Sequence, residues 1–184
     1  MFVGLTTSSS AGFSYTLFFV PNAYRLLPSF AIPELLKTKG QVVILSSASA
    51  QIRLPNASEY CVSKHAMLRF AEFVAIGEYY CLVSHSYYTS DPHRFSVEYP
   101  DIKVFSVHPG TVKTDLYDEA DGQFTVNSTV ELAASTIQYA TSGKADYLSG
   151  RYVSVQWDLG EVERDWKEKI IAQNGLVSKL FIPT

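Results

Sequence analysis

Tyr60 and Lys64 stand four residues apart in a segment whose apolar residues recur at helical spacing. On a helix, residues four apart share one face about one turn apart, so the sequence predicts a phenol beside an ammonium. A nearby cation favours the ionised form of a phenol, which can exchange a proton with an alcohol oxygen. Ser47 precedes this pair by one loop, and we expect its hydroxyl to polarise the same oxygen.

The spacing alone does not single out this pair, because the chain has twelve tyrosines and a second Tyr-x-x-x-Lys at Tyr99 and Lys103. Tyr99 precedes a proline, and a residue in that position is disfavoured in the helical conformation. Tyr60 instead opens a periodic segment. The context therefore favours Tyr60 and Lys64, against the simpler interpretation of a half-buried tyrosine beside a solvated lysine and a Ser47 that only caps a loop.

Short β-branched runs alternate with helical patterns around these residues. Strands are predicted at Gln41–Leu45, Ile102–Val107 and Arg151–Val155. Helices are predicted at Glu59–Ala75, at Val130–Tyr139 and from Tyr24 through a Lys-Thr-Lys run to Gly40. This alternation predicts βαβ units, hence an α/β fold with a partial doubly wound parallel sheet. Ser47 and Pro109-Gly110 each follow a strand, at the edge where open α/β sheets bind ligands. The alternative for Pro109-Gly110 is an ordinary turn.

The composition fits one globular domain and excludes several classes of protein. The 184 residues are 47% hydrophobic and 18% charged, unlike a disordered, collagen-like or coiled-coil chain. The net charge of −3, without a basic run, argues against binding to nucleic acid or an anionic membrane. The apolar stretch at 11–20 is too short to span a membrane.

The cysteines and histidines suggest no metal site. Cys61 and Cys81 form neither a disulfide framework nor a metal-binding spacing, which favours a reducing compartment and predicts a cytoplasmic protein. His65 and His108 are interpreted as satisfied structural histidines. Neither Ser46 nor Ser47 lies in the Gly-x-Ser-x-Gly turn of a serine hydrolase.

The order of these elements resembles the catalytic half of the classical short-chain dehydrogenase/reductase family. The resemblance is carried by the strand ending in Ser47, the helix with Tyr60 and Lys64, and the strand followed by Pro109-Gly110. It implies that Tyr60 is the general acid/base, that Lys64 favours its ionised form and holds the nicotinamide ribose, and that Ser47 orients a carbonyl.

By the same resemblance, the nicotinamide side of NAD or NADP lies against Tyr60, Lys64, Pro109, Gly110, Val112 and Thr114. The implied function is an NAD(P)-dependent oxidoreductase that interconverts a secondary alcohol and a ketone by hydride transfer. Its substrate would be a small molecule.

The sequence departs from the family in two places. None of the ten glycines is close enough to another to form the Gly-rich turn whose amides hold the cofactor's pyrophosphate. We therefore expect a weakened cofactor affinity in a chain that corresponds to the C-terminal half of the fold and is N-terminally truncated. Asn22 stands two or three residues out of register with the family's catalytic asparagine.

These departures predict a division of the chain into three parts. Residues 1–23 form an irregular segment of separate origin, 24–160 a partial NAD(P)-binding Rossmann-like domain, and 161–184 a C-terminal tail. Residues 77–96 are an insertion between the helix at Glu59–Ala75 and the following strand, and our hypothesis is a retained intron.

A second function remains open beside the oxidoreductase. In that alternative, the chain is a catalytically inactive fragment or pseudoenzyme, and it associates at most with homologous chains. Without the first half of the fold, the strand at Gln41–Leu45 would expose an edge, which favours association. The sequence therefore predicts poor solubility or a fold that depends on a partner, and a homo-oligomer is one candidate for that partner.

Overall fold

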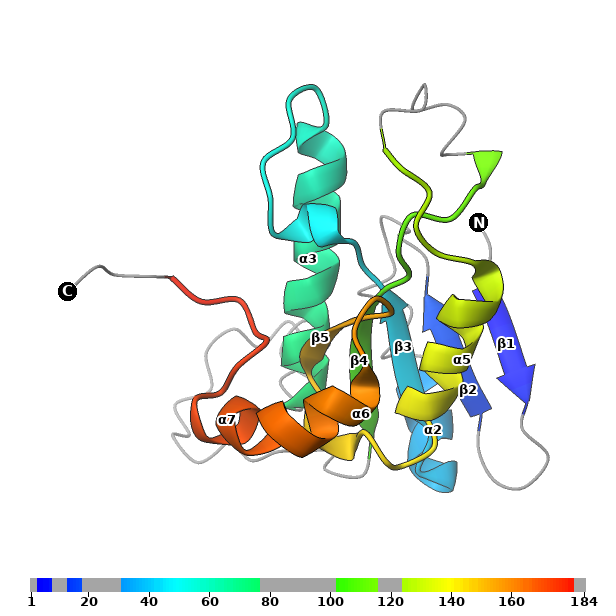
Figure 1. The fold of residues 1–184 in the computed structure, drawn as a ribbon. Coiled ribbons are helices and arrows are strands. Elements are labelled where there is room, and N and C mark those ends of the chain that lie inside the picture. Colours follow the sequence, from blue (N-terminus) through cyan, green and yellow to red (C-terminus); the bar gives the residue numbers. More distant parts are fainter. Residues whose placement is uncertain (1–2, 8–12, 18–30, 77–101, 116–123, 181–184) are drawn as a thin grey trace, which may run out of the picture.

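A computed structural model describes residues 3–7, 13–17, 31–76, 102–115 and 124–180 of the chain (Figure 1). Its centre is a five-stranded sheet in the order β1-β2-β3-β4-β5. The strands are β1 (Val3–Thr7), β2 (Phe13–Leu17), β3 (Gln41–Leu45), β4 (Lys103–His108) and β5 (Arg151–Ser154). Strands β2 to β5 run parallel, and β1 is antiparallel to β2. The α/β class and the parallel sheet are therefore confirmed.

Helices cover both faces of this sheet. The helical elements are α2 (Ile32–Thr38), η2 (Ala48–Ala50), α3 (Ser58–Ala75), α5 (Val130–Ala140), η4 (Asp146–Leu148), α6 (Leu159–Glu161), η5 (Val162–Trp166) and α7 (Lys167–Ala172). Two helices, α2 and α3, pack on one face, and α5 with the C-terminal helices packs on the other (Figure 1). The arrangement is that of a doubly wound fold.

Strand β3 shows why the sequence forms this sheet. Its side chains alternate between the two cores, with Val42 and Ile44 under α3 and Val43 under the helices of the opposite face. All three are fully buried. A continuous β-branched run is what a strand with two buried faces requires, and the predicted range of this strand agrees with the structure.

The expectation of an exposed β3 edge is wrong, because β2 pairs with β3 in parallel, with Tyr15 opposite Val42. Strands β1 and β2 lie within residues 1–23, where the sequence indicates no regular element. A free strand edge offers a row of unpaired backbone groups to any extended segment. A segment that has no periodicity of its own can therefore still form a strand.

The remaining strands and helices lie close to their predicted positions. Helix α3 starts one residue before the prediction, β4 is shifted by one residue, and β5 ends one residue early. In the first predicted helix, the structure describes α2 only from Ile32. Asn22 and the predicted insertion at 77–96 lie outside the described residues.

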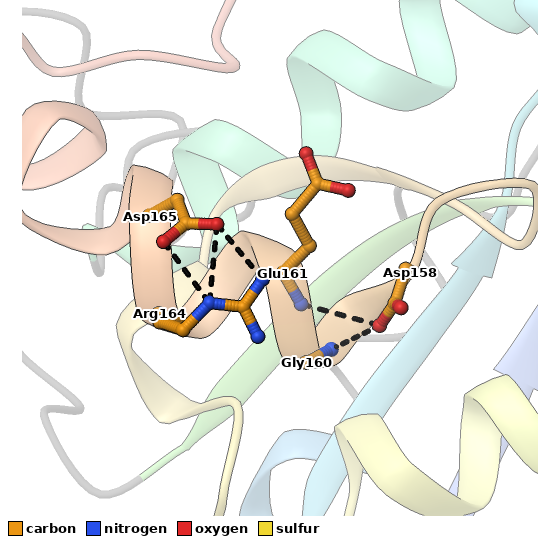
Figure 2. A network of polar contacts seen from close by, with 5 residues as sticks. All are labelled: Asp158, Gly160, Glu161, Arg164 and Asp165. Atoms are coloured by element: carbon orange, nitrogen blue, oxygen red, sulfur yellow. Dashed lines mark hydrogen bonds and ion pairs between the residues drawn. The ribbon is translucent and has the colours of Figure 1, made fainter.

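The chain is helical after β5. Asp158 caps α6, because its Oδ1 accepts hydrogen bonds from the amides of Gly160 (2.8 Å) and Glu161 (3.2 Å) (Figure 2). In η5, which follows α6, Arg164 forms an ion pair with the adjacent Asp165 at 2.9 Å (Figure 2). No helix in the described part of the chain is long and apolar enough to cross a membrane.

Candidate active site

Ser47 lies at the carboxyl end of β3, where the chain leaves the sheet. The backbone amide of Ser46 donates a hydrogen bond to the carbonyl oxygen of Val107 on β4 (2.8 Å). The hydroxyl oxygen of Ser47 caps η2 by accepting a hydrogen bond from the backbone amide of Ser49 (3.1 Å). That bond uses an acceptor position of the hydroxyl and leaves its O–H as a donor. Ser47 therefore caps a turn and still has a proton to offer a neighbouring oxygen.

Helix α3 brings Tyr60 and Lys64 together, as their spacing predicts. The Lys64 Nζ lies 5.6 Å from the centroid of the Tyr60 ring. The two side chains differ in exposure, since Tyr60 is 38% exposed whereas Lys64 is partly buried. The Tyr60 side chain is therefore open to solvent, whereas Lys64 is partly shielded from it.

Lys64 is also bonded to the strand that carries Ser47. Its Nζ donates to the carbonyl oxygen of Leu45 (3.1 Å), and the Ser46 hydroxyl donates to the carbonyl oxygen of Lys64 (3.1 Å). An ammonium has three donors, so the bond to Leu45 leaves two for other partners. Burial lowers the pKa of Lys64, because desolvation disfavours the charged form.

Pro109 and Gly110 leave β4 at the same edge, because Leu45 and Val107 are register partners on β3 and β4. Gly110 has a φ of 76°, in the left-handed region that favours glycine. A Cβ there would stand 1.9 Å from the Ser128 Oγ. Ser128 thus explains the glycine by close packing, whether or not a cofactor lies nearby.

Asn127 holds the loop after Gly110 in place. Its side-chain Oδ1 accepts a hydrogen bond from the backbone amide of Thr111 (2.8 Å). Its backbone amide donates to the carbonyl oxygen of Thr111 (3.1 Å). Beyond this clamp, Val112 is partly exposed and Thr114 exposed. Sequence reasoning missed Asn127, because its partner Thr111 lies 16 residues away and leaves no local signal.

His108 precedes this loop and differs from its interpretation as a satisfied histidine. The ring is 8% exposed and stacks on Tyr152, with 6.4 Å between centroids. Its buried Nδ1 has no hydrogen-bond partner among the described residues. Burial lowers the pKa of His108 and raises the pKa of Tyr152 to about 12. In the same described residues, no group of His, Cys, Asp or Glu could hold a metal ion.

The described residues fit one part of a nicotinamide dinucleotide. Lys64 has donors left for ribose hydroxyls, and Ser47 and Tyr60 carry hydroxyls at the same edge of the sheet. No Gly-rich turn in the sequence would hold the pyrophosphate. Among the described residues, Lys64 could therefore hold the ribose of such a dinucleotide.

Comparison with known proteins places the chain in a family. It is 31% identical over 137 residues to the short chain dehydrogenase pigC of Monascus ruber, covering 71% of this chain and 39% of that protein. It is 42% identical over 87 residues to an Arabidopsis thaliana 11-beta-hydroxysteroid dehydrogenase-like protein 3, covering 47% of this chain and 22% of that protein. No family model matches the chain.

Solved structures share the fold. A 7 alpha-hydroxysteroid dehydrogenase complexed with NADH and 7-oxo glycochenodeoxycholic acid aligns with a TM-score of 0.53 at 18% identity, over 72% of this chain and 49% of the other. A short chain dehydrogenase from Salmonella enterica aligns with a TM-score of 0.55 at 19% identity, over 74% and 49%. The chain belongs to the short-chain dehydrogenase/reductase family, and it spans half or less of the length of the curated relatives it matches.

Proposed function

We propose that the chain carries the nicotinamide-side half of an NAD(P)-dependent oxidoreductase site that interconverts a secondary alcohol and a ketone. The observation that carries the proposal is the position of Lys64. Its Nζ lies beside the Tyr60 ring and is bonded to the strand end that leads into Ser47. These two contacts of Lys64, with the ring of Tyr60 and with the residue two before Ser47, support a single site at the edge of the sheet where open α/β folds bind ligands.

Each side chain has a separate task in this reaction. The Tyr60 hydroxyl gives its proton to the ketone oxygen during reduction and takes it back during oxidation. The Ser47 O–H donates to the same oxygen and orients the carbonyl. Lys64 favours the ionised phenol through its charge and offers its remaining donors to the ribose. A bound nicotinamide dinucleotide supplies or accepts the hydride.

The choice of a nicotinamide dinucleotide rests on the family. The 7 alpha-hydroxysteroid dehydrogenase neighbour was solved with NADH. The described residues of this chain that face the same edge of the sheet do not discriminate NAD from NADP. Both dinucleotides therefore belong in the assay.

Cofactor-dependent reduction of a panel of small ketones tests the proposal, with NADH and NADPH each supplied in excess. We expect slow turnover by the wild-type chain and a loss of about 10²-fold or more in Tyr60→Phe, because general acid/base groups contribute about that much. Tyr139→Phe is the matched control. It removes a phenolic hydroxyl that bonds Glu163 (3.0 Å) on the other face of the sheet.

Two results would contradict the proposal. Turnover retained in Tyr60→Phe would exclude Tyr60 as the acid/base. Absence of turnover with every ketone and both cofactors, in a folded protein, would favour the alternative of an inactive chain that associates with homologous proteins.

A further inference from the structure

The turn that contains Ser47 is bonded to α3 at a second point, after the serine. The Nδ1 atom of His65 lies 2.8 Å from the carbonyl oxygen of Ala50, the last residue of η2. Because a carbonyl oxygen only accepts, Nδ1 must carry the proton. In the neutral ring the other nitrogen, Nε2, is then an acceptor.

The Nε2 atom of His65 faces the C-terminal tail. The hydroxyl of Ser178 lies 3.5 Å from it, and the amide of Ser178 donates to the Glu72 carboxylate on α3 (2.6 Å). Upstream, the amide of Tyr152 bonds the carbonyl of Leu176 (2.9 Å), so the tail also lies along β5. One imidazole thus contacts the Ser47 turn with one nitrogen and the tail with the other.

Consecutive residues of α3 hold the chain on both sides of Ser47. Before the serine, Lys64 bonds Leu45 and Ser46, and after it His65 bonds Ala50. Within the turn, the Ala50 amide bonds the Ser47 carbonyl (3.0 Å). The position of Ser47 relative to Tyr60 therefore depends on bonds made by the helix that carries Tyr60.

We propose that His65 is a positioning residue, which fixes Ser47 relative to Tyr60 by holding the carbonyl of Ala50. The catalytic part of this inference rests on the proposed function, and the structural part does not. The imidazole itself touches the turn and the tail, and it acts on the reaction through Ser47.

His65 can be changed without removing the residues that pack α3 on the sheet. Its side chain is exposed, whereas those residues, Met67, Ala71 and Val74, are buried. His65→Leu removes the donor at Nδ1 and leaves those contacts in place. His65→Asn restores an N–H donor at a similar distance from the backbone. Val62→Ala, at a residue 68% exposed on the same helix, is the matched control.

Hydrogen–deuterium exchange of the full chain tests the structural part without any need for turnover. We expect the amides of Ser49, Ala50 and Gln51 to exchange about two- to tenfold faster in His65→Leu, which is the effect of losing one hydrogen bond. His65→Asn should restore most of the protection, and Val62→Ala should not change it. Ser178→Ala should have a smaller effect, because its contact is the longer one.

Kinetics test the catalytic part. His65→Leu should lower kcat by about two- to tenfold with little change in KM, because a misplaced Ser47 weakens an interaction made in the transition state. His65→Asn should recover kcat, which a general loss of stability would not explain.

The results separate the inference from the proposed function. Unchanged exchange in a folded His65→Leu overturns the inference, with or without turnover. Faster exchange with an unchanged kcat also overturns it, because the position of Ser47 would then not matter. If His65→Leu exchanges faster, His65→Asn restores the protection and the chain shows no turnover at all, the bond from His65 to Ala50 is supported. That result counts against the proposed function instead.

Discussion

The Nζ of Lys64 donates a hydrogen bond to the carbonyl oxygen of Leu45, 3.1 Å away, and so joins the middle of α3 to the carboxyl end of β3. The same amine lies beside the Tyr60 ring. One lysine therefore connects the strand that leads to Ser47 with the helix that presents the phenol.

Replacement of Lys64 by methionine should change how stability depends on pH. Burial lowers the pKa of Lys64, so between that lowered value and about 10.5 the unfolded chain binds more protons than the folded one. The cost of burying the charge is present at neutral pH and fades as the pH rises through this window. The free energy of unfolding of wild type should therefore rise relative to Lys64→Met toward pH 10.5. Urea titrations at several pH values measure it, and a constant difference would contradict the prediction.

Replacement of Gly110 by alanine should destabilise the protein more than the same change at Gly143. Both glycines have positive φ values, 76° and 88°, but a Cβ at Gly110 meets Ser128 whereas at Gly143 it meets nothing within 4 Å. Gly143→Ala should cost about 1–2 kcal/mol from backbone strain. Gly110→Ala adds about 1–3 kcal/mol from overpacking. Chemical denaturation of both variants checks this, and equal losses would show that the loop moves away from Ser128.

Replacement of His108 by glutamine should make the stability of the protein less sensitive to acid. Because burial lowers the pKa of His108, the unfolded chain binds the proton first as the pH falls below about 6.5. Wild-type stability should fall relative to His108→Gln from that pH down to the lowered pKa, and then level off. Thermal melts across this range measure the difference. A difference that does not change with pH would mean that the imidazole titrates equally in both states.

Transcripts should test the hypothesis that 77–96 is a retained intron. Excising it joins Phe73–Ile76, at the end of α3, directly to Val97 and the approach to β4. We expect spliced reads that skip these codons, with a donor at Gly77–Tyr79 and an acceptor at Ser96. If every read continues through the segment, it belongs to the protein.

The sequence predicted those elements whose own residues carry the signal. The continuous β-branched run at Gln41–Leu45 and the helical periodicity around Tyr60 and Lys64 are properties of single segments, and both elements lie where they were expected. The edge of the sheet that carries the candidate site could be predicted from these elements, because parallel strands place their carboxyl ends at the same edge.

The features that the sequence did not predict depend on distant partners. Strand β2 forms against the edge of β3, and the tail reaches α3 through Ser178 and Glu72, which are 106 residues apart. The bond from His65 to Ala50 spans 15 residues, and a lone histidine on a helix has no signal for it. His108 Nδ1, which has no partner among the described residues, likewise depends on a distant element, because the ring stacks on Tyr152 of β5.

Saturation-transfer NMR with NADH tests most directly the central claim that this chain carries the nicotinamide side of the site. We predict that the nicotinamide ring and its ribose receive more saturation from the protein than the adenine does, and that Lys64→Met weakens the transfer severalfold. The experiment detects weak binding and needs no substrate. No transfer at millimolar NADH, or transfer strongest at the adenine and unaffected by Lys64→Met, would contradict the account.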